Sequence, residues 1–391
     1  MSDKIIPVNE TTLKNELKEY IKKTIQETLN ELLDAEAEEL VKAEKYERSQ
    51  NRVAYRSGHY KRGLTTTSGQ IELKIPKLRN AKFQTAIIER YQRRETSVEE
   101  AMVEMYLAGV STRRIEDVTE LLWDSSVSPA TISNLNEKAY SKIEEWRSRP
   151  LTGKYAYVYV DGIYLKRNWG GSYSNVCILV AIGVNENGER EIIGCDEGFR
   201  ESKESWKEFL LWLKSRGLAG VQLLVADKCQ GLIGSLEEVF PEAKYQRCTV
   251  HFYRNVLNKV PQKKRQFVGK MVRAIHEQES FEASMCKAED VIKKLSEEGL
   301  KEAAKVVKDG CLETLTYTYF PIKHWKYIRT NNGIERINRE IRRRTRVVGT
   351  FPDGKSALML VTARLKYIAE GQWQKRKYLN MSLLEEKEVS D

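Results

Sequence analysis

Three acidic residues have the surroundings expected of a metal-dependent active site. Asp161 follows the apolar run "YAYVYV", Asp227 follows the apolar run "VQLLVA", and Glu335 lies in the arginine-rich stretch "RTNNGIERINREIRRRTRVVG". A carboxylate at the end of a buried strand is costly unless it is paired or bound to a metal. Three converging carboxylates suit hard divalent cations, Mg²⁺ above all and also Mn²⁺. Two such ions about 4 Å apart can activate the attacking oxygen and stabilise the leaving oxygen in phosphodiester cleavage.

Each acid also has a plainer interpretation. Asp161 and Gly162 form an Asp-Gly dipeptide, which is common in turns. Glu335 and Arg339 have the i, i+4 spacing of a helical ion pair. Considered one at a time, these structural interpretations are favoured. Two acids at the same end of strands in one sheet, with a third on a later helix, together favour a shared metal site.

Basic residues gather in two parts of the chain. The whole chain has 66 Lys and Arg against 56 Asp and Glu. Residues 51–94 contain eleven basic and two acidic residues, and residues 323–346 contain nine and two. Clustered positive charge is expected of a protein that binds nucleic acid. The candidate DNA contacts are Arg56, Lys61, Arg62, Arg113, Arg114, Arg336, Arg339, Arg342, Arg343, Arg344 and Arg346.

The helix predicted around the third acid explains why an acid lies among arginines. Its buried stripe consists of Ile334, Ile337 and Ile341. The adjoining shoulder carries Glu335, Asn338, Arg339 and Arg342. That shoulder can face a cleft, where the acid binds metal and the arginines bind DNA phosphates.

The amino-terminal part of the chain is predicted to form three regions. Residues 1–50 contain an amphipathic helix, predicted over 11–48, whose apolar stripe could pack inside the chain or pair with another protomer. Residues 51–94 read as a basic β-hairpin, either a solvated edge or an arm that contacts phosphates. Residues 95–150 read as short helices joined by turns, which resembles a helix-turn-helix and favours DNA binding.

The remainder is predicted to be an α/β (α+β) core interrupted by helices. Residues 151–251 contain three strands in succession, the first ending at Asp161, then a helix, a strand ending at Asp227, a helix and a fifth strand. Residues 252–320 have helical periodicity and read as an all-helical insertion. Residues 321–391 resume the core with the helix of Glu335 and a C-terminal helix.

Cysteine usage and hydropathy favour a reduced, cytoplasmic protein. The six cysteines form no C-x-x-C pair, so neither a disulfide framework nor a four-cysteine zinc site is indicated. No apolar run approaches the ~20 residues that span a bilayer, and the first residues lack the apolar core of a signal peptide. We therefore expect no membrane partner.

Four motifs carry a specific resemblance. They are "YVDGIYLK" at 159–166, "VADKCQGL" at 225–232, "QRCTVHFYRNVL" at 246–257 and "RTNNGIERINREIRRRTRVVGTFP" at 329–352. In this order and spacing the chain resembles the Mutator-type bacterial insertion-sequence transposases, which have an RNase H-like, retroviral-integrase-type catalytic core. The resemblance extends over nearly the whole chain and is weakest in residues 1–50.

The resemblance implies a DDE triad of Asp161, Asp227 and Glu335 that binds Mg²⁺ or Mn²⁺, with two ions expected. It also implies that Cys248 and His251 neighbour the active site, although a buried thiol and a satisfied histidine are an open alternative. Lys228 stands where relatives often have Gly or Ala, and it could contact phosphate or shift the metal site.

The function implied is that of a DNA transposase in the bacterial cytoplasm, near the nucleoid. Such an enzyme binds the terminal inverted repeats of its element, cleaves there and joins the freed 3′-hydroxyls to target DNA. Joining two ends favours a homodimer or a larger assembly on DNA. The alternatives are an RNase H-like nuclease without transposition and a DNA-binding regulator with an inert core.

Overall fold

The computed structural model describes residues 10–43, 52–89, 92–108, 110–169, 172–198, 201–348, 351, 353–371, 373–374 and 376–384. The chain divides into two compact units, Met1–Ala139 and Tyr140–Asp391. Helix α4 (Pro129–Arg147) contains the boundary between them. None of the described helices is long and apolar enough to cross a membrane.

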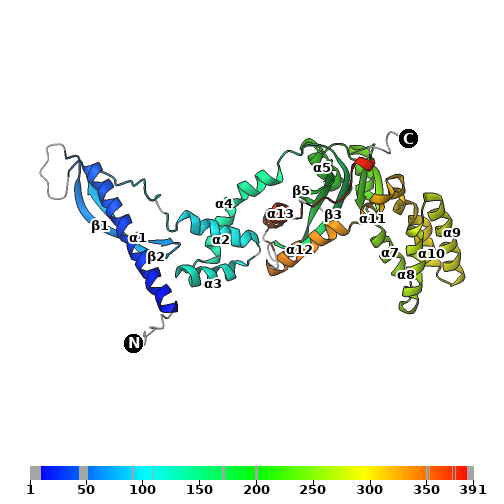
Figure 1. Cartoon of the computed structure of the whole chain (residues 1–391), viewed down its shortest axis with the longest axis horizontal. Helices are drawn as coiled ribbons and strands as arrows, with labels where there is room; N and C mark the ends of the chain where they lie inside the picture. The colour runs from blue at the N-terminus through cyan, green and yellow to red at the C-terminus, as the bar shows by residue number, and fades with distance from the viewer. Residues whose placement is uncertain are drawn as a thin grey trace, which may run out of the picture. The chain divides into compact units, whose positions relative to one another are not determined.

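The first unit begins with a long helix that packs on a β-hairpin. Helix α1 (Glu10–Val41) lies along strands β1 (Tyr55–Thr66) and β2 (Gly69–Arg79), which pair antiparallel (Figure 1). Leu33 of α1 is fully buried and shares a core with four hairpin residues, Leu64, Ile71, Leu73 and Ile75. The hairpin predicted from the sequence is therefore present, and α1 covers one of its faces.

The apolar stripe predicted along the first helix is only partly buried. Ile25 and Leu29 pack against the hairpin core, whereas Leu13 and Leu17 are more than half exposed. The steps of three and four residues along the sequence assign Leu32 to this stripe, which is wrong, because its neighbour Leu33 faces the hairpin and Leu32 is left exposed. Residues 44–48, which the sequence pattern assigns to the same helix, lie outside the described residues.

Three helices complete the first unit and enclose a small core of their own. Helices α2 (Thr96–Ala108), α3 (Thr112–Trp123) and α4 bury Val98, Met102, Ile115, Trp123, Val127, Ile132 and Leu135. The Ser111 side chain accepts a hydrogen bond from the Arg114 N–H and caps α3. Ser128 caps α4 in the same way, accepting from the Thr131 N–H.

The second unit is built on a mixed five-stranded sheet with the order β5-β4-β3-β6-β7. Strand β4 (Ser172–Asn185) pairs antiparallel with both β3 (Tyr155–Trp169) and β5 (Arg190–Gly198). Strands β6 (Leu223–Ala226) and β7 (Lys244–Arg247) run parallel to β3. Strands β3 to β6 contain apolar runs of the sequence, whereas β7 has the polar sequence Lys-Tyr-Gln-Arg.

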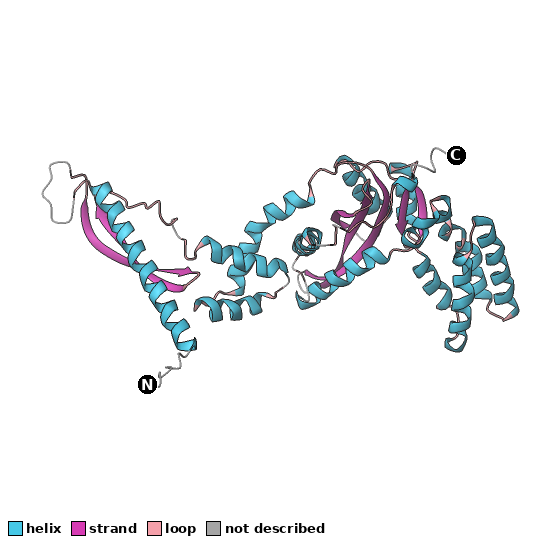
Figure 2. Ribbon diagram, in the orientation of Figure 1, coloured by secondary structure: helices cyan, strands magenta, loops and turns pink. Residues whose placement is uncertain are grey.

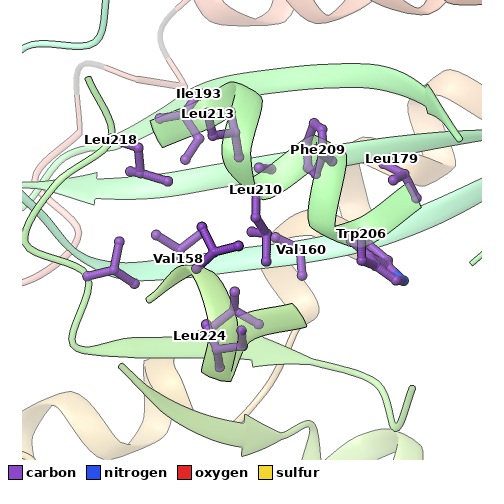
Figure 3. Packing of buried hydrophobic residues seen from close by; sticks show 14 of the residues in the cluster. Val158, Val160, Leu179, Ile193, Trp206, Phe209, Leu210, Leu213, Leu218 and Leu224 are labelled. Atoms are coloured by element: carbon purple, nitrogen blue, oxygen red, sulfur yellow. The ribbon is translucent and has the colours of Figure 1, made fainter. Parts of the chain in front are cut away.

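One face of this sheet is covered by helices α5 (Lys203–Ser215) and α6 (Gln230–Val239). Val158 and Val160 of β3 point toward Phe209 and Leu210 of α5 in the main core (Figure 3). Ser202 caps α5 by accepting from the Ser205 N–H. Because successive side chains of a strand alternate between faces, the odd-numbered residues of β3 must point the other way.

The opposite face receives the last third of the chain. The Tyr157 hydroxyl is 2.8 Å from Nδ1 of His324, and the Tyr159 hydroxyl donates to the Tyr327 carbonyl at 3.2 Å. These partners belong to or adjoin helix α11 (Trp325–Ile328), which is followed by α12 (Asn332–Val348) and α13 (Gly354–Glu370). Helices therefore flank both faces of the sheet (Figure 2).

Residues 252–320 are all described, and they contain helices and turns without a strand, as their periodicity predicts. The main elements are α7 (Thr249–Leu257), α8 (Arg265–Ala274), α9 (Phe281–Glu297) and α10 (Lys301–Gly310). A 3₁₀ turn, η3 (Leu312–Thr314), then leads the chain back beside β7.

One prediction about the sheet is wrong. The first strand does not end at Asp161 but continues to Trp169, and Asp161 lies opposite Val180 of β4. The Asp-Gly pair is therefore not a turn. The long apolar strand β4 supplies hydrogen bonds beyond this point, which outweighs the local turn preference of the dipeptide.

Candidate active site

The sheet register brings the first two acids together. Tyr159 of β3 lies beside Val225 of the parallel strand β6, so two residues later Asp161 and Asp227 lie at neighbouring positions. Asp227 directly follows β6, as predicted. Glu335 is in the first turn of α12.

All three acids line one cleft with a volume of about 600 Å³. The other residues that line it are His251, Arg254, Asn338, Arg339, Glu340, Arg342, Arg343 and Arg346. In the part of the chain that the structure describes, no three His, Cys, Asp or Glu side chains already lie close enough to hold a metal ion. The cleft therefore brings the acids to a common surface, and their side chains are held by other partners.

Asp161 accepts a hydrogen bond on each of its two carboxylate oxygens. Its Oδ1 accepts a hydrogen bond from the Gly162 N–H at 3.0 Å, and its Oδ2 accepts one from Nδ2 of Asn338 at 2.6 Å. Burial raises the pKa of Asp161 to about 6, and the nearby charge of Glu201 acts in the same direction. The Gly162 N–H and the cations His251 and Arg342 oppose this rise.

Asp227 is held by the backbone that follows it. Its Oδ1 accepts from the Lys228 N–H at 2.7 Å, and its carbonyl accepts from the Tyr245 hydroxyl at 2.8 Å. The Lys228 side chain turns away to Glu313 of η3, with 3.2 Å between Nζ and Oε1. Glu313 also lies 3.5 Å from the buried guanidinium of Arg247. Lys228 thus has a protein partner in the helical insertion.

Glu335 is bound by two cations of helix α7. Its Oε1 lies 3.1 Å from Nε2 of His251 and 3.3 Å from Nη1 of Arg254. The interaction with Cys248 and the negative charges of Asp227 and Glu335 raise the pKa of His251 to about 9, against the effect of its burial. His251 is therefore a cation beside the third acid.

Cys248 connects the beginning of α7 to the beginning of α12. It is fully buried, and its Sγ accepts a hydrogen bond from the Asn331 N–H at 3.2 Å. One residue later, the Thr249 N–H donates to the carbonyl of Arg329 at 3.0 Å. The C-x-x-H pair thus fixes the α12 start through Cys248 and contacts Glu335 through His251.

Comparison with known proteins decides the family. Residues 2–376 match the family described as "Transposase, Mutator family". The chain belongs to this family. It is 37% identical to the transposase for insertion sequence element ISRM5 of Rhizobium meliloti, over 91% of this chain and 89% of the relative. It is 33% identical to the transposase for IS256 in transposon Tn4001 of Staphylococcus aureus, over 97% of both chains.

A third relative is the transposase for IS1081 of Mycobacterium tuberculosis, which is 34% identical over 90% of this chain and 85% of the relative. The resemblance seen in the four sequence motifs is thereby confirmed. The protein is a transposase, an enzyme that cuts DNA and joins strands. This favours transposition over the simple nuclease and the inert regulator that the sequence left open.

The transposase family implies divalent metal ions, and the donors in the cleft suit them. The carboxylates of Asp161, Asp227 and Glu335 are oxygen ligands of the kind that Mg²⁺ and Mn²⁺ prefer. The raised pKa of Asp161 shows that no neighbouring cation fully compensates its charge. The described residues that line the cleft include no cysteine, and Cys248 beside it is fully buried and bound to the backbone, so a soft-metal site is not favoured.

The arginines of α12 divide between the cleft and the core of the transposase. Arg339, Arg342, Arg343 and Arg346 line the cleft, and Arg336 is exposed outside it. Arg343 forms an ion pair with Glu340 at 3.0 Å. Arg344 is only 5% exposed, unlike the other arginines of this helix, so its burial argues against a role as a DNA contact. Helical periodicity places it on the side of Ile337, seven residues earlier.

The basic candidates of the first unit also divide into two groups. Arg56 pairs with Glu38 of α1 at 2.9 Å, and Arg62 donates to the carbonyls of Glu89 and Gln92. Both side chains therefore hold the hairpin to its surroundings. The exposed candidates are Lys61, which pairs with Glu72 at 2.8 Å, Arg113, and Arg114, which pairs with Asp117 at 3.2 Å.

Two residues around the cleft, Arg254 and Glu201, were not predicted from the sequence. Arg254 follows His251 by three residues, a helical spacing that could have indicated its place in the cleft. Glu201 lies against Gly162, where a Cβ would come within 2.5 Å of its Oε1. No local signal marks Glu201, because its neighbours in the sequence belong to the start of α5.

Proposed function

We propose that Asp161, Asp227 and Glu335 are the catalytic triad of an RNase H-like transposase. In this role the three carboxylates hold divalent ions, Mg²⁺ or Mn²⁺, with two ions expected. The enzyme cleaves at the terminal inverted repeats of its element and joins the 3′-hydroxyls to target DNA. Three antiparallel strands followed by two parallel ones, with helices on both faces, support the RNase H-like assignment.

The observation that carries this proposal is the composition of the cleft. Carboxylates from β3, from the end of β6 and from α12 form one part of its lining, and four arginines of α12 form another. A phosphodiester brings negative charge to such a place, which the arginines balance while the carboxylates hold metal. Both cleavage and joining are displacements at phosphorus, so one site serves both steps.

The protein side chains have separable tasks in this scheme. Asp161 is oriented by Asn338 and Gly162, and Asp227 is oriented by the Lys228 N–H. His251 and Arg254 hold Glu335 at the cleft. When bound, the ions would activate the attacking oxygen and stabilise the leaving oxygen.

DNA contacts are assigned to the exposed cations. On α12 these are Arg336, Arg339, Arg342, Arg343 and Arg346, and in the first unit they are Lys61, Arg113 and Arg114. The first unit would recognise the terminal repeats, since its basic hairpin and short helices resemble a DNA-binding region. Two element ends require two such units, which supports a dimer or a larger assembly on DNA.

Substitution of the three acids tests the triad. Asp161→Asn, Asp227→Asn and Glu335→Gln each keep the side-chain shape and remove the anionic ligand. Cleavage and joining of terminal-repeat DNA in Mg²⁺ should be abolished in each, while binding of that DNA is retained. Glu340→Gln is the matched control, because this acid lines the same cleft but pairs with Arg343 and Arg364.

The Glu340→Gln enzyme should still cleave. Strand transfer by any of the three acid variants above a few per cent of the unmodified enzyme would remove that residue from the triad. Loss of cleavage in all four variants would mean that the cleft tolerates no change of charge, and the assignment of three particular ligands would fail.

A further inference from the structure

The side chain of Asn338 forms a hydrogen bond between α12, which carries Glu335, and β3, which carries Asp161. It lies three residues after Glu335 on α12, and its Nδ2 donates to Oδ2 of Asp161 on β3 at 2.6 Å. The side chain is 1% exposed and lines the same cleft as the three acids. The contact joins residues that are 177 positions apart in the sequence.

This bond completes the orientation of the Asp161 carboxylate. Oδ1 accepts from the Gly162 N–H, and Oδ2 accepts from Asn338. With one donor on each oxygen, rotation of the carboxylate plane would break at least one of the two bonds. Each oxygen also keeps a lone pair, so the group can still bind a metal. Hydrogen bonds of this kind commonly orient the carboxylates of metal sites.

Protein stability does not explain an asparagine at this position. Among the described residues, Oδ1 of Asn338 has no hydrogen-bond partner. A buried amide that uses only part of its hydrogen-bonding capacity is costly. The other buried positions of this part of α12 are Ile334, Ile337 and Ile341. An apolar side chain at position 338 would have no unpaired polar atom.

Asn331 provides an instructive comparison. It is also fully buried, and its Nδ2 donates to the carbonyl of Val160 at 3.0 Å. It therefore ties the start of α12 to the same strand, one residue before Asp161. Oδ1 of Asn331 is also without a hydrogen-bond partner among the described residues, so the two asparagines differ in their acceptor, which is a backbone carbonyl for Asn331 and a carboxylate of the cleft for Asn338.

We propose that Asn338 is a positioning residue of the catalytic centre, which holds the Asp161 carboxylate in the orientation that binds metal together with Asp227 and Glu335. This inference rests on the proposed function of those three acids. It predicts that the amide of Asn338 acts on metal binding through Asp161 and contributes little to the stability of the fold.

The test uses the full chain with Asn338→Leu, which keeps the branched shape in a somewhat larger side chain and removes the donor. The Mg²⁺ concentration for half-maximal cleavage should rise, and Mn²⁺ affinity measured by electron paramagnetic resonance without DNA should fall, by about 10–100-fold. The melting temperature without metal should stay the same or increase. Asn338→Ala, which removes the donor without placing a new charge beside Asp161, should show the same losses.

Asn331→Leu is the matched control, because it breaks the other bond between α12 and β3. It should leave the Mn²⁺ affinity unchanged, although it removes a buried amide that donates one hydrogen bond to β3 as Asn338 does. The inference is overturned if both Asn338 variants bind Mn²⁺ like the unmodified protein, or if their losses match a lower melting temperature. Asp161→Asn distinguishes a failure of this inference from a failure of the proposed function. If that variant still cleaves, the triad itself is wrong, whatever the Asn338 variants do.

Discussion

Nε2 of His251 lies 3.1 Å from Oε1 of Glu335, so the acid on α12 is held by a cation on α7. The contact links the two helices that border the insertion, and Arg254 reinforces it from the next turn of α7. The third acid therefore depends on α7 for its orientation, although neither His251 nor Arg254 belongs to the core sheet.

Removal of this cation should impair catalysis more than DNA binding. We expect His251→Ala to lower the cleavage rate by about 10–100-fold, because a partner that orients a metal-binding side chain is lost. His251→Gln should recover part of that loss, since its amide can still donate to Glu335. Single-turnover cleavage beside a DNA-binding titration measures both. A rate that is unchanged in both variants would show that Glu335 needs no such support.

The arginines of α12 should separate into DNA contacts and a structural residue. Arg343→Gln together with Arg346→Gln removes two cations that line the cleft, so the log–log salt dependence of DNA binding should become shallower by up to about 2. Exposed substitutions usually change the free energy of unfolding by only about 0.5 kcal/mol, so the melting temperature should hold.

Arg344→Gln should give the opposite result, because Arg344 is buried. We expect a lower melting temperature with little change in the salt dependence of binding. The two variants are compared by thermal unfolding and by titration at several salt concentrations. A shallower salt dependence in Arg344→Gln alone would restore Arg344 as a DNA contact.

The pair formed by Lys228 and Glu313 predicts unequal effects of its two members. Lys228→Met breaks a partly exposed ion pair and should change the free energy of unfolding by about 1 kcal/mol or less. Glu313→Gln also removes the acid beside the buried Arg247 and should destabilise by about 2 kcal/mol. Denaturant unfolding measures both. Equal, small effects would show that Arg247 does not need Glu313.

Helix α1 should be required for the hairpin. Leu33 belongs to the hairpin core, and Arg56 pairs with Glu38 of the same helix. A fragment of residues 51–148 should therefore be digested rapidly in its hairpin by protease, whereas residues 1–148 should resist. Binding to terminal-repeat DNA should follow the same order. Equal protease resistance of the two fragments would mean that the hairpin folds without α1.

Most of the strands and helices follow from hydrophobic periodicity, because they bury an apolar run or stripe. The end of β3 did not follow, since the dipeptide Asp161-Gly162 favours a turn locally and only the pairing with β4 overrides it. The burial of Arg344 could have been predicted. Its position seven residues after Ile337 places both on one side of the helix.

The prediction that the three acids lie close together depended on the order of the strands in the sheet. The sequence indicates that order only through the succession of strands and helices along the chain. The structure places Asp161, Asp227 and Glu335 along one cleft. The partners of Asp161 and Cys248 were beyond prediction. Asn338 is 177 positions from Asp161, and Asn331 is 83 positions from Cys248, so only the packing of α12 on β3 and α7 reveals them.

The division of the chain at Ala139 has a consequence for its synthesis on the ribosome. Domains generally fold as units from the N-terminus while about 5–20 residues are added per second. Glu335 follows the first unit by 196 residues, so it emerges about 10–40 s later. During that interval the first unit of a nascent chain can be complete while Glu335, the third acid of the proposed triad, has not yet emerged. A chain that binds DNA during translation would then be tethered beside its own gene before it is able to cleave.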